Sequence, residues 1–300
     1  FVGADGRFTL DYIAEVFRNP LYLEGLWNSF RIGVFSTLLA CLIAMPLAWM
    51  SDRFIFPGKT LLGALVLVPM IMPPFVGAIG VKQILGQQGA LNALLADLGL
   101  LNPQAPIDWL GEGRIWGVVA LIALNLYPIL YLNVLAALAN VDPAMEEAAE
   151  NLGCTGFRKF RKITLPLIMP GVFAGGTIVF IWSFTELGVP LVFDYSRTAS
   201  VQIYDGIKGL DKNPIPYALT TILLIVAAAV FALSKFVIGR SPLGTAPRPK
   251  TRSVATRIGG WKALACAMCY LAVFLLAALP HLGAIMLSFS ERWYGTVIPD

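Results

Sequence analysis

Six long apolar stretches constrain the fold of this chain more than any other feature. A helix needs about 20 predominantly apolar residues to cross the hydrocarbon core of a bilayer. The stretches that meet this requirement are Leu26–Met50, Thr60–Gly80, Ile115–Leu138, Leu167–Phe193, Tyr217–Ile238 and Ala263–Ser288. The sequence therefore predicts an all-α polytopic membrane protein with about six transmembrane helices.

The charge content supports the same class. Only 13% of the 300 residues are charged and 57% are hydrophobic, whereas about a quarter of the residues in a soluble domain carry charge. The formal net charge of +4 is small, and basic loops that meet anionic lipid headgroups account for it. Nucleic acid is therefore not an expected partner.

The distribution of basic residues predicts the orientation in the membrane. Cytoplasmic loops carry an excess of Lys and Arg. Outside the six stretches, most lysines and arginines lie in segments 51–59, 139–166 and 239–262. We therefore expect these segments on the inner side, and residues 1–25, 84–114 and 194–216 on the outer side.

A polar, basic island, residues 142–166, separates the third and fourth stretches. Asp142 suits a helix N-cap, Pro143 the first helical position and Gly153 the position just beyond the end. These signals predict a short helix over 143–152. At helical spacing one face would carry Met145, Ala148, Ala149 and Leu152, and the other Glu146, Glu147 and Glu150. The acids are expected to pair with a partner's basic groups or with this loop's own Arg158, Lys159, Arg161 and Lys162.

The spacing within this island matches a known motif. Taken alone, an E-A-A triplet is common, and an ordinary loop with an incidental helix is the alternative. Here the triplet lies between two apolar stretches and is followed by Gly, Ile and Leu-Pro. The matching positions are Glu147, Ala148, Ala149, Gly153, Ile163, Leu165 and Pro166. This pattern resembles the EAA loop of type I ABC importer permeases.

The resemblance implies a helical-bundle permease in the plasma membrane of a prokaryote, the inner membrane if the cell is Gram-negative. It implies that the island contacts cytoplasmic ABC ATPase subunits, which act as a dimer, and that a solute-binding protein delivers cargo outside. The chain itself would hydrolyse nothing and hold no cofactor. No P-loop, Ser-His arrangement or metal-ligand cluster is found in the sequence.

Three segments are similar to one group within that family, the double-length ferric iron permeases. They are the run from Phe180 to Pro190 (FIWSFTELGVP), Gln202-Ile203-Tyr204, and the basic segment 239–262. Permeases for 2-aminoethylphosphonate, thiamine and polyamines share these features. The resemblance therefore implies ferric iron as the solute, with the other three as alternatives.

The domain organisation follows from the same resemblance. Residues 1–238 are expected to form a first permease unit that lacks its first helix, with the coupling loop at 142–166. Segment 239–262 is rich in Pro, Gly, Arg and Lys and predicts a flexible cytoplasmic linker. Residues 263–300 are expected to open a second permease unit. Since Phe1 is no initiator Met and the last apolar stretch ends close to Asp300, we expect a fragment of a longer polypeptide.

Polar groups at membrane depth are candidates for the translocation pathway. Arg31 lies roughly 8 Å and Glu186 roughly 10 Å from the outer ends of their predicted spans. The two side chains are expected to form a structural ion pair, or Arg31 snorkels to the interface, or either contacts the solute. Asn125 is a further candidate, with an interhelical hydrogen bond as the alternative.

Other functional classes find less support in the sequence. An ion-coupled secondary transporter would place acids at the midplane in broken helices, and Glu186 is off-centre in its predicted span. A membrane scaffold would not need a bounded inner helix.

Cys266 and Cys269 form a C-x-x-C pair inside an apolar stretch, where packing explains them better than metal binding does. His281 is the single histidine, and one histidine is no metal site.

Overall fold

The structure is a computed structural model that describes residues 9–111, 114–209, 213–239, 255–289, 293 and 295–298, with backbone alone at 237–239. The described part is mostly helical. In chain order its elements are α1 (Asp11–Arg18), α2 (Pro20–Arg53), β1 (Phe54–Ile55), α3 (Lys59–Leu65), a 3-10 turn (Val68–Ile71), α4 (Pro74–Leu85), α5 (Ala90–Asp97), α6 (Ile115–Leu138), α7 (Pro143–Asn151), α8 (Gly156–Lys159), a π-helical turn (Phe160–Thr164), α9 (Leu165–Thr185), α10 (Gly188–Val192), α11 (Ala199–Lys208), α12 (Ile215–Gly239), β2 (Thr256–Arg257) and α13 (Gly260–Ser288).

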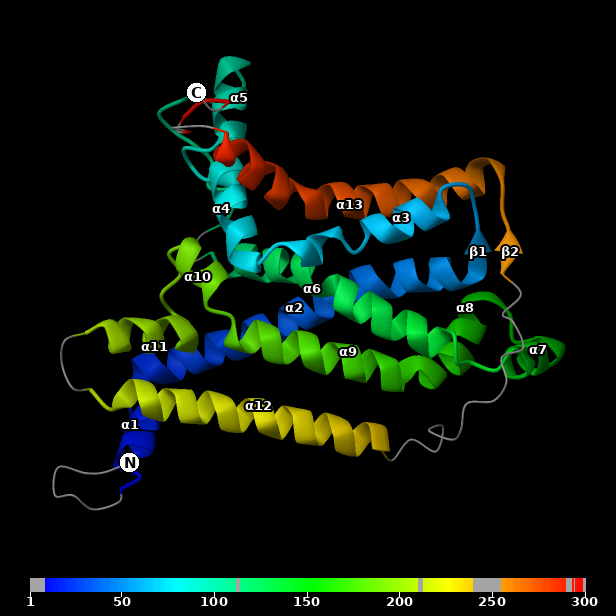
Figure 1. Cartoon of the computed structure of the whole chain (residues 1–300), viewed down its shortest axis with the longest axis horizontal. Helices are drawn as coiled ribbons and strands as arrows, with labels where there is room; N and C mark the ends of the chain where they lie inside the picture. The colour runs from blue at the N-terminus through cyan, green and yellow to red at the C-terminus, as the bar shows by residue number, and fades with distance from the viewer. Residues whose placement is uncertain are drawn as a thin grey trace.

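The long helices lie side by side in one bundle. α2, α6 and α9 pack against one another, α12 packs on the far side of α9, and α13 packs on α4 (Figure 1). Among the described residues, five helices are long and apolar enough to cross a membrane, and a bent pair raises the number to six. The expected all-α polytopic membrane protein is confirmed. We call the end of the bundle that carries α7 the inner end and the opposite end, with α5 and α11, the outer end.

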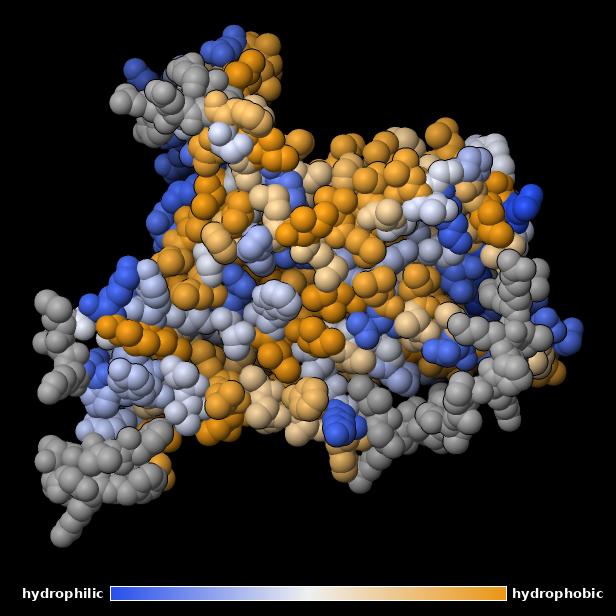
Figure 2. Space-filling view, viewed as in Figure 1, coloured by the Kyte–Doolittle hydropathy of each residue, from blue (hydrophilic) through white to orange (hydrophobic). Residues whose placement is uncertain are grey.

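The surface agrees with a bundle that crosses a membrane. Hydrophobic residues cover the middle of the visible face, over α13, α3 and α6, and hydrophilic residues gather toward the two ends (Figure 2). Apolar surface that would be costly in water is favourable against lipid tails. The band between the two hydrophilic ends is therefore the part that meets the hydrocarbon.

The second predicted span, Thr60–Gly80, is not one helix. The segment Lys59–Ile71 and the segment Pro74–Asp97 meet at 94°, because Pro73 and Pro74 cannot continue a hydrogen-bonded helix. Backbone groups freed inside a membrane need new partners. The Asn125 Nδ2 donates to the Pro69 carbonyl at 3.0 Å, and the Tyr127 hydroxyl donates to the Val66 carbonyl at 2.9 Å. α6 thus supports the break.

The fourth predicted span, Leu167–Phe193, ends earlier than expected. α9 stops at Thr185, and the short helix α10 follows after a break at Glu186. Pro190 explains this difference, because its ring would clash with the Glu186 carbonyl in a continuous helix. Glu186 therefore lies at a helix end rather than inside a span. Its Oε1 accepts hydrogen bonds from the backbone N–H groups of Gly188 at 3.0 Å and Val189 at 3.3 Å.

The last helix, α13, is bound to the rest of the bundle at both of its ends. At the inner end β2 pairs in parallel with β1, and the Tyr270 hydroxyl donates to the Leu47 carbonyl at 2.7 Å. Nearer the outer end, Gly80 of α4 and Gly283 of α13 allow the two backbones to touch. Most of the predicted linker 239–262 lies outside the described residues, and the assignment of 263–300 to a second permease unit stays a prediction.

This glycine crossing yields a stability prediction. A Cβ at Gly80 would lie 2.1 Å from the Pro280 carbonyl oxygen, so Gly80→Ala forces α4 and α13 apart. We expect the variant to lose about 1–3 kcal/mol of stability, the usual cost of overpacking, seen as a lower melting temperature in detergent. Gly63→Ala is the matched control, because nothing lies within 4 Å of a Cβ there. Equal melting temperatures for the two variants would contradict the close crossing.

Candidate functional site

The helix predicted in the polar island forms as α7 and starts at its expected cap. Asp142 has an extended backbone, and its Oδ1 accepts a hydrogen bond from the Ala144 N–H at 2.9 Å. Pro143 occupies the first helical position, where its missing N–H costs nothing. The start of α7 is therefore fixed by local sequence alone.

The end of α7 is fixed equally well. Gly153 adopts φ +75°, a left-handed conformation that glycine accepts most readily. The N–H of Gly153 donates to the Glu150 carbonyl at 2.8 Å, and the N–H of Cys154 donates to the Ala149 carbonyl at 2.9 Å. This pair of bonds is a Schellman motif. α7 is thus a short helix bounded at both ends, at the inner end of the bundle (Figure 1).

A buried carboxylate attaches α7 to the bundle. Glu146 is 6% exposed and pairs with the Arg53 guanidinium at the end of α2. The Thr164 hydroxyl donates to the Glu146 Oε1 at 2.8 Å, and the Lys159 Nζ lies 3.8 Å from its Oε2. Burial acts to raise the pKa of Glu146, but the bonds from Arg53 and Thr164 and the charges of Arg53 and Lys159 outweigh it and hold the pKa below its ordinary value. The carboxylate is therefore held in its charged form.

This attachment corrects the predicted faces of α7. Ala149 does not lie on the open face with Met145 and Leu152. It is 7% exposed and shares the buried side with Glu146, three residues earlier. Met145, Ala148 and Leu152 are exposed, as are Glu147 and Glu150. Tertiary contacts of Glu146 decide the rotation of the helix, and the sequence pattern does not contain them.

The pairing expected within the loop is confirmed in part. The Lys159 Nζ lies 2.5 Å from the Glu150 Oε1. In the described part of the chain no ion pair involves Arg158, Arg161 or Lys162. These three groups are exposed at the inner end, where anionic headgroups or a partner protein can meet them.

The remaining motif residues connect α7 to α9. Ile163 lies in the π-helical turn, and Leu165 and Pro166 are the first residues of α9. The segments from Gly156 to Thr185 form one continuous span. Because a π-helical turn often marks a functional position in a helix, its Thr164 contact with Glu146 is notable. It ties the start of the span directly to α7.

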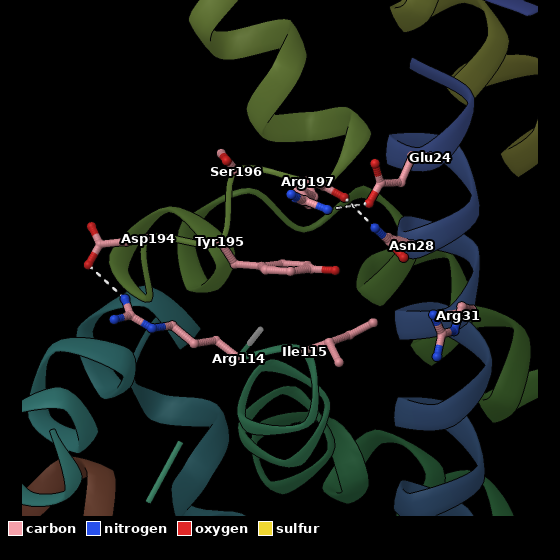
Figure 3. A pocket seen from close by; sticks show the side chains of 9 residues that line it. All are labelled: Glu24, Asn28, Arg31, Arg114, Ile115, Asp194, Tyr195, Ser196 and Arg197. Atoms are coloured by element: carbon pink, nitrogen blue, oxygen red, sulfur yellow. Dashed lines mark hydrogen bonds and ion pairs between the residues drawn. The ribbon is translucent and has the colours of Figure 1, made fainter. Parts of the chain in front are cut away.

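A second site lies at the outer end, where a pocket of about 540 Å³ opens. Its walls are one face of α2 (Glu24, Asn28, Arg31), the start of α6 (Arg114, Ile115) and segment 194–197 between α10 and α11. The Tyr195 side chain extends across the pocket toward α2 (Figure 3). Arg31 belongs to this pocket, and no ion pair joins it to Glu186 in the part of the chain that the structure describes.

The three predicted pathway residues are thus not gathered at one place. Arg31 lines the outer pocket, Glu186 caps α10, and Asn125 supports the broken span. The sequence reasoning missed Arg53 and Thr164 at the inner site, and it placed Glu146 among the acids that pair within the loop but did not predict its contact with α2. Arg53 ends an apolar stretch and Glu146 precedes the motif, but neither position carries a signal of mutual contact. A role for Arg31, Glu186 or Asn125 in translocation stays a prediction.

Comparison with known proteins gives a family match. Residues 39–242 match the model of the binding-protein-dependent transport system inner membrane components. The spermidine/putrescine transport system permease protein PotB of Haemophilus influenzae is 34% identical over 171 residues, which are 57% of this chain and 58% of that protein. A Haloferax volcanii protein named for molybdenum ABC transport is 32% identical over 213 residues, 70% of this chain and 74% of that protein.

A third relative is much longer than this chain. FbpB 1 of Haemophilus influenzae, named for ferric transport, is 30% identical over 237 residues, 77% of this chain but 35% of that protein. The chain therefore spans only part of the length of PotB and FbpB 1.

Solved structures show the same fold. A bacterial ABC transporter involved in the import of the acidic polysaccharide alginate has a TM-score of 0.60 at 19% identity, covering 80% of this chain and 86% of that chain. An amino acid ABC transporter has a TM-score of 0.52 at 20% identity, covering 78% of this chain and all of that one.

Proposed function

The chain belongs to the family of binding-protein-dependent transport system inner membrane components, and we propose that α7 is its point of contact with a separate ATPase. The family is one of transport permeases, in which the membrane chain does no catalysis. Alternating access in this chain would then follow movement imposed on α7 from the inner side. A binding protein would deliver the solute at the outer end.

One observation carries this proposal: α7 is a capped helix whose buried side is joined by a charged pair to α2. A contact made on the open side of α7 displaces the helix as a unit, since both ends are fixed by caps. The displacement reaches α2 through Arg53 and α9 through Thr164. A single displacement of α7 would therefore move two long helices.

A pocket of about 370 Å³ beside α7 supports a protein partner of basic character. It is lined by four carboxylates, Asp52, Glu146, Glu147 and Glu150, and by two basic groups, Arg53 and Lys159. The excess of acidic groups favours a Lys or Arg side chain of the partner.

For the solute we propose ferric iron. The support is the similarity of three sequence segments to ferric iron permeases and the alignment with FbpB 1 over 77% of this chain. The second candidates are a polyamine, since PotB is 34% identical, and the molybdenum species of the Haloferax volcanii relative. The proposal predicts that cells carrying the whole transport system take up radioactive iron, and uptake of putrescine alone would overturn it.

The contact at α7 is tested by cross-linking. In a background without the native cysteines, a single cysteine at Leu152, which is 87% exposed, should cross-link to the co-expressed ATPase. A cysteine at Ala149, which is 7% exposed and one turn away, should not. The readout is a band of combined mass on a denaturing gel. Equal cross-linking at both positions, or none at Leu152, would refute the docking surface.

A further inference from the structure

The outer pocket has a charge arrangement that no role of α7 explains. Three guanidinium groups and two carboxylates line it. Arg114 lies 3.0 Å from Asp194, and Arg197 lies 3.0 Å from Glu24. Each carboxylate is therefore already neutralised by an arginine of the pocket.

Arg31 is left over. In the described part of the chain its side chain makes no ion pair and no hydrogen bond, although it lies on the membrane-spanning helix α2. It is partly buried on α2, one turn from Asn28 and two turns from Glu24 (Figure 3). A guanidinium without a partner at such a place is costly unless water or an anion satisfies it.

The walls of the pocket are held in place by cross-links between distant segments. Asn28 is 5% exposed, and its Nδ2 donates to the Arg197 carbonyl at 3.0 Å. On the opposite wall the Arg114 guanidinium donates to the Phe193 carbonyl at 2.6 Å, and Lys82 lies 2.6 Å from Asp194. Segment 193–197 is therefore tied to α2 on one side and to α4 and α6 on the other.

Backbone strain is concentrated at the same place. Arg114 (φ 56°) and Asp194 (φ 55°) are the two non-glycine residues with positive φ in the described part of the chain, and they are each other's ion-pair partners. Left-handed backbone at residues other than glycine costs energy and tends to occur at functional sites. Contacts across the pocket therefore hold these two residues in a backbone conformation that their local sequence disfavours.

Neutral hydrogen-bonding groups complete the lining. Tyr195 and Ser196 both line the pocket, and the Tyr195 ring carries its hydroxyl toward α2 (Figure 3). Burial raises the pKa of Tyr195, and the positive charge of Arg31, which lines the same pocket (Figure 3), acts against this rise. The Tyr195 hydroxyl stays protonated at neutral pH and can donate to an oxyanion beside Arg31.

We propose that the outer pocket binds an anion, an oxyanion or a carboxylate group, on the Arg31 guanidinium with the Tyr195 hydroxyl as a second donor. A planar guanidinium matches the oxygens of such groups in a bidentate manner. The pocket carries one net positive charge, whereas a polyamine would need free carboxylates, and both carboxylates here are paired. The inference rests on the proposed function in one respect: the anion is part of the imported solute, or accompanies it.

The proposal is tested by binding to the purified chain in nanodiscs, without an ATPase. The probes are phosphate, citrate and ferric citrate, measured by isothermal titration calorimetry at low ionic strength. We expect saturable binding that weakens about tenfold or more in Arg31→Gln, because a charge-assisted hydrogen bond is lost. Arg31→Lys should keep part of the affinity. Arg18→Gln, which removes an exposed charge on α1, should bind like the unaltered chain.

Each outcome decides the matter. Tighter binding of ferric citrate than of citrate identifies the ligand as a metal chelate, and equal binding identifies it as a free anion. Unchanged affinity in Arg31→Gln, or saturable binding of putrescine alone, overturns the proposal. If Arg31→Gln does not fold, Tyr195→Phe removes only a hydroxyl and should weaken binding a few-fold. Since no ATPase is present, a failure here leaves the coupling role of α7 untouched, and a failure of cross-linking at α7 leaves the anion site untouched.

Discussion

Gly153→Pro is expected to reduce ATP-driven uptake to background while the protein still inserts into the membrane. Proline holds φ near −65° and has no N–H, whereas Gly153 has φ +75° and donates to the Glu150 carbonyl. The substitution removes the C-terminal boundary of α7 without touching the spans. Uptake into proteoliposomes that contain the ATPase and the binding protein measures the loss. The amount of folded protein extracted from the membrane in detergent measures insertion.

Gly99→Pro is the matched control for this effect. Gly99 follows the short helix α5 at the outer end, also has a positive φ, +70°, and like Gly153 would meet no atom within 4 Å of an added Cβ. Its change should leave most uptake intact, because α5 is far from α7 (Figure 1). A loss of uptake as large as that of Gly153→Pro would show that any disturbed helix end is harmful.

Glu147→Lys probes the same coupling without altering the backbone. Glu147 is exposed and borders the acidic pocket beside α7, so reversal of its charge should repel a basic partner group and also abolish uptake. Normal uptake in either Gly153→Pro or Glu147→Lys would remove the coupling role from α7.

The sequence predicted those parts of the structure that depend on local chemistry. The limits of α6 agree with the predicted stretch Ile115–Leu138, and α7 begins and ends at the residues that its cap signals indicate. The second predicted span is bent, and the side chains that donate to its freed carbonyls, those of Asn125 and Tyr127, lie more than fifty residues away in sequence, so local chemistry could not predict these contacts. Apolar content alone does not distinguish a straight span from a bent one.

The two candidate sites differ in how far the sequence could predict them. The motif residues of the inner site follow one another in sequence, so their spacing was informative. The outer pocket brings together residues from α2, α6 and segment 194–197, and nothing in the spacing of Glu24, Arg114 and Arg197 indicates that they meet. Arg31 was found as a charge in an apolar stretch, but the absence of a partner for its side chain among the described residues depends on the fold.

The Arg53–Glu146 pair gives the second large effect. Arg53→Glu places two carboxylates against each other, and Glu146 has 8% of its side chain exposed. Breaking a fully buried pair costs about 3–5 kcal/mol. Because Arg53 is 24% exposed, we expect a smaller loss of about 1–3 kcal/mol and a strong reduction of uptake. The loss is measured as a lower melting temperature in detergent.

A charge swap distinguishes the contact between Arg53 and Glu146 from the effect of either charge alone. Arg53→Glu with Glu146→Arg restores opposite charges across the contact, so both stability and uptake should recover in part. Recovery should be incomplete, because the new arginine meets Lys159, now 3.8 Å from the Glu146 carboxylate, and loses the bond that Thr164 donates. Arg18→Glu, an exposed reversal on α1, should change neither quantity. If the double variant is no better than Arg53→Glu alone, the two residues act independently, and movement of α7 does not reach α2 through this pair.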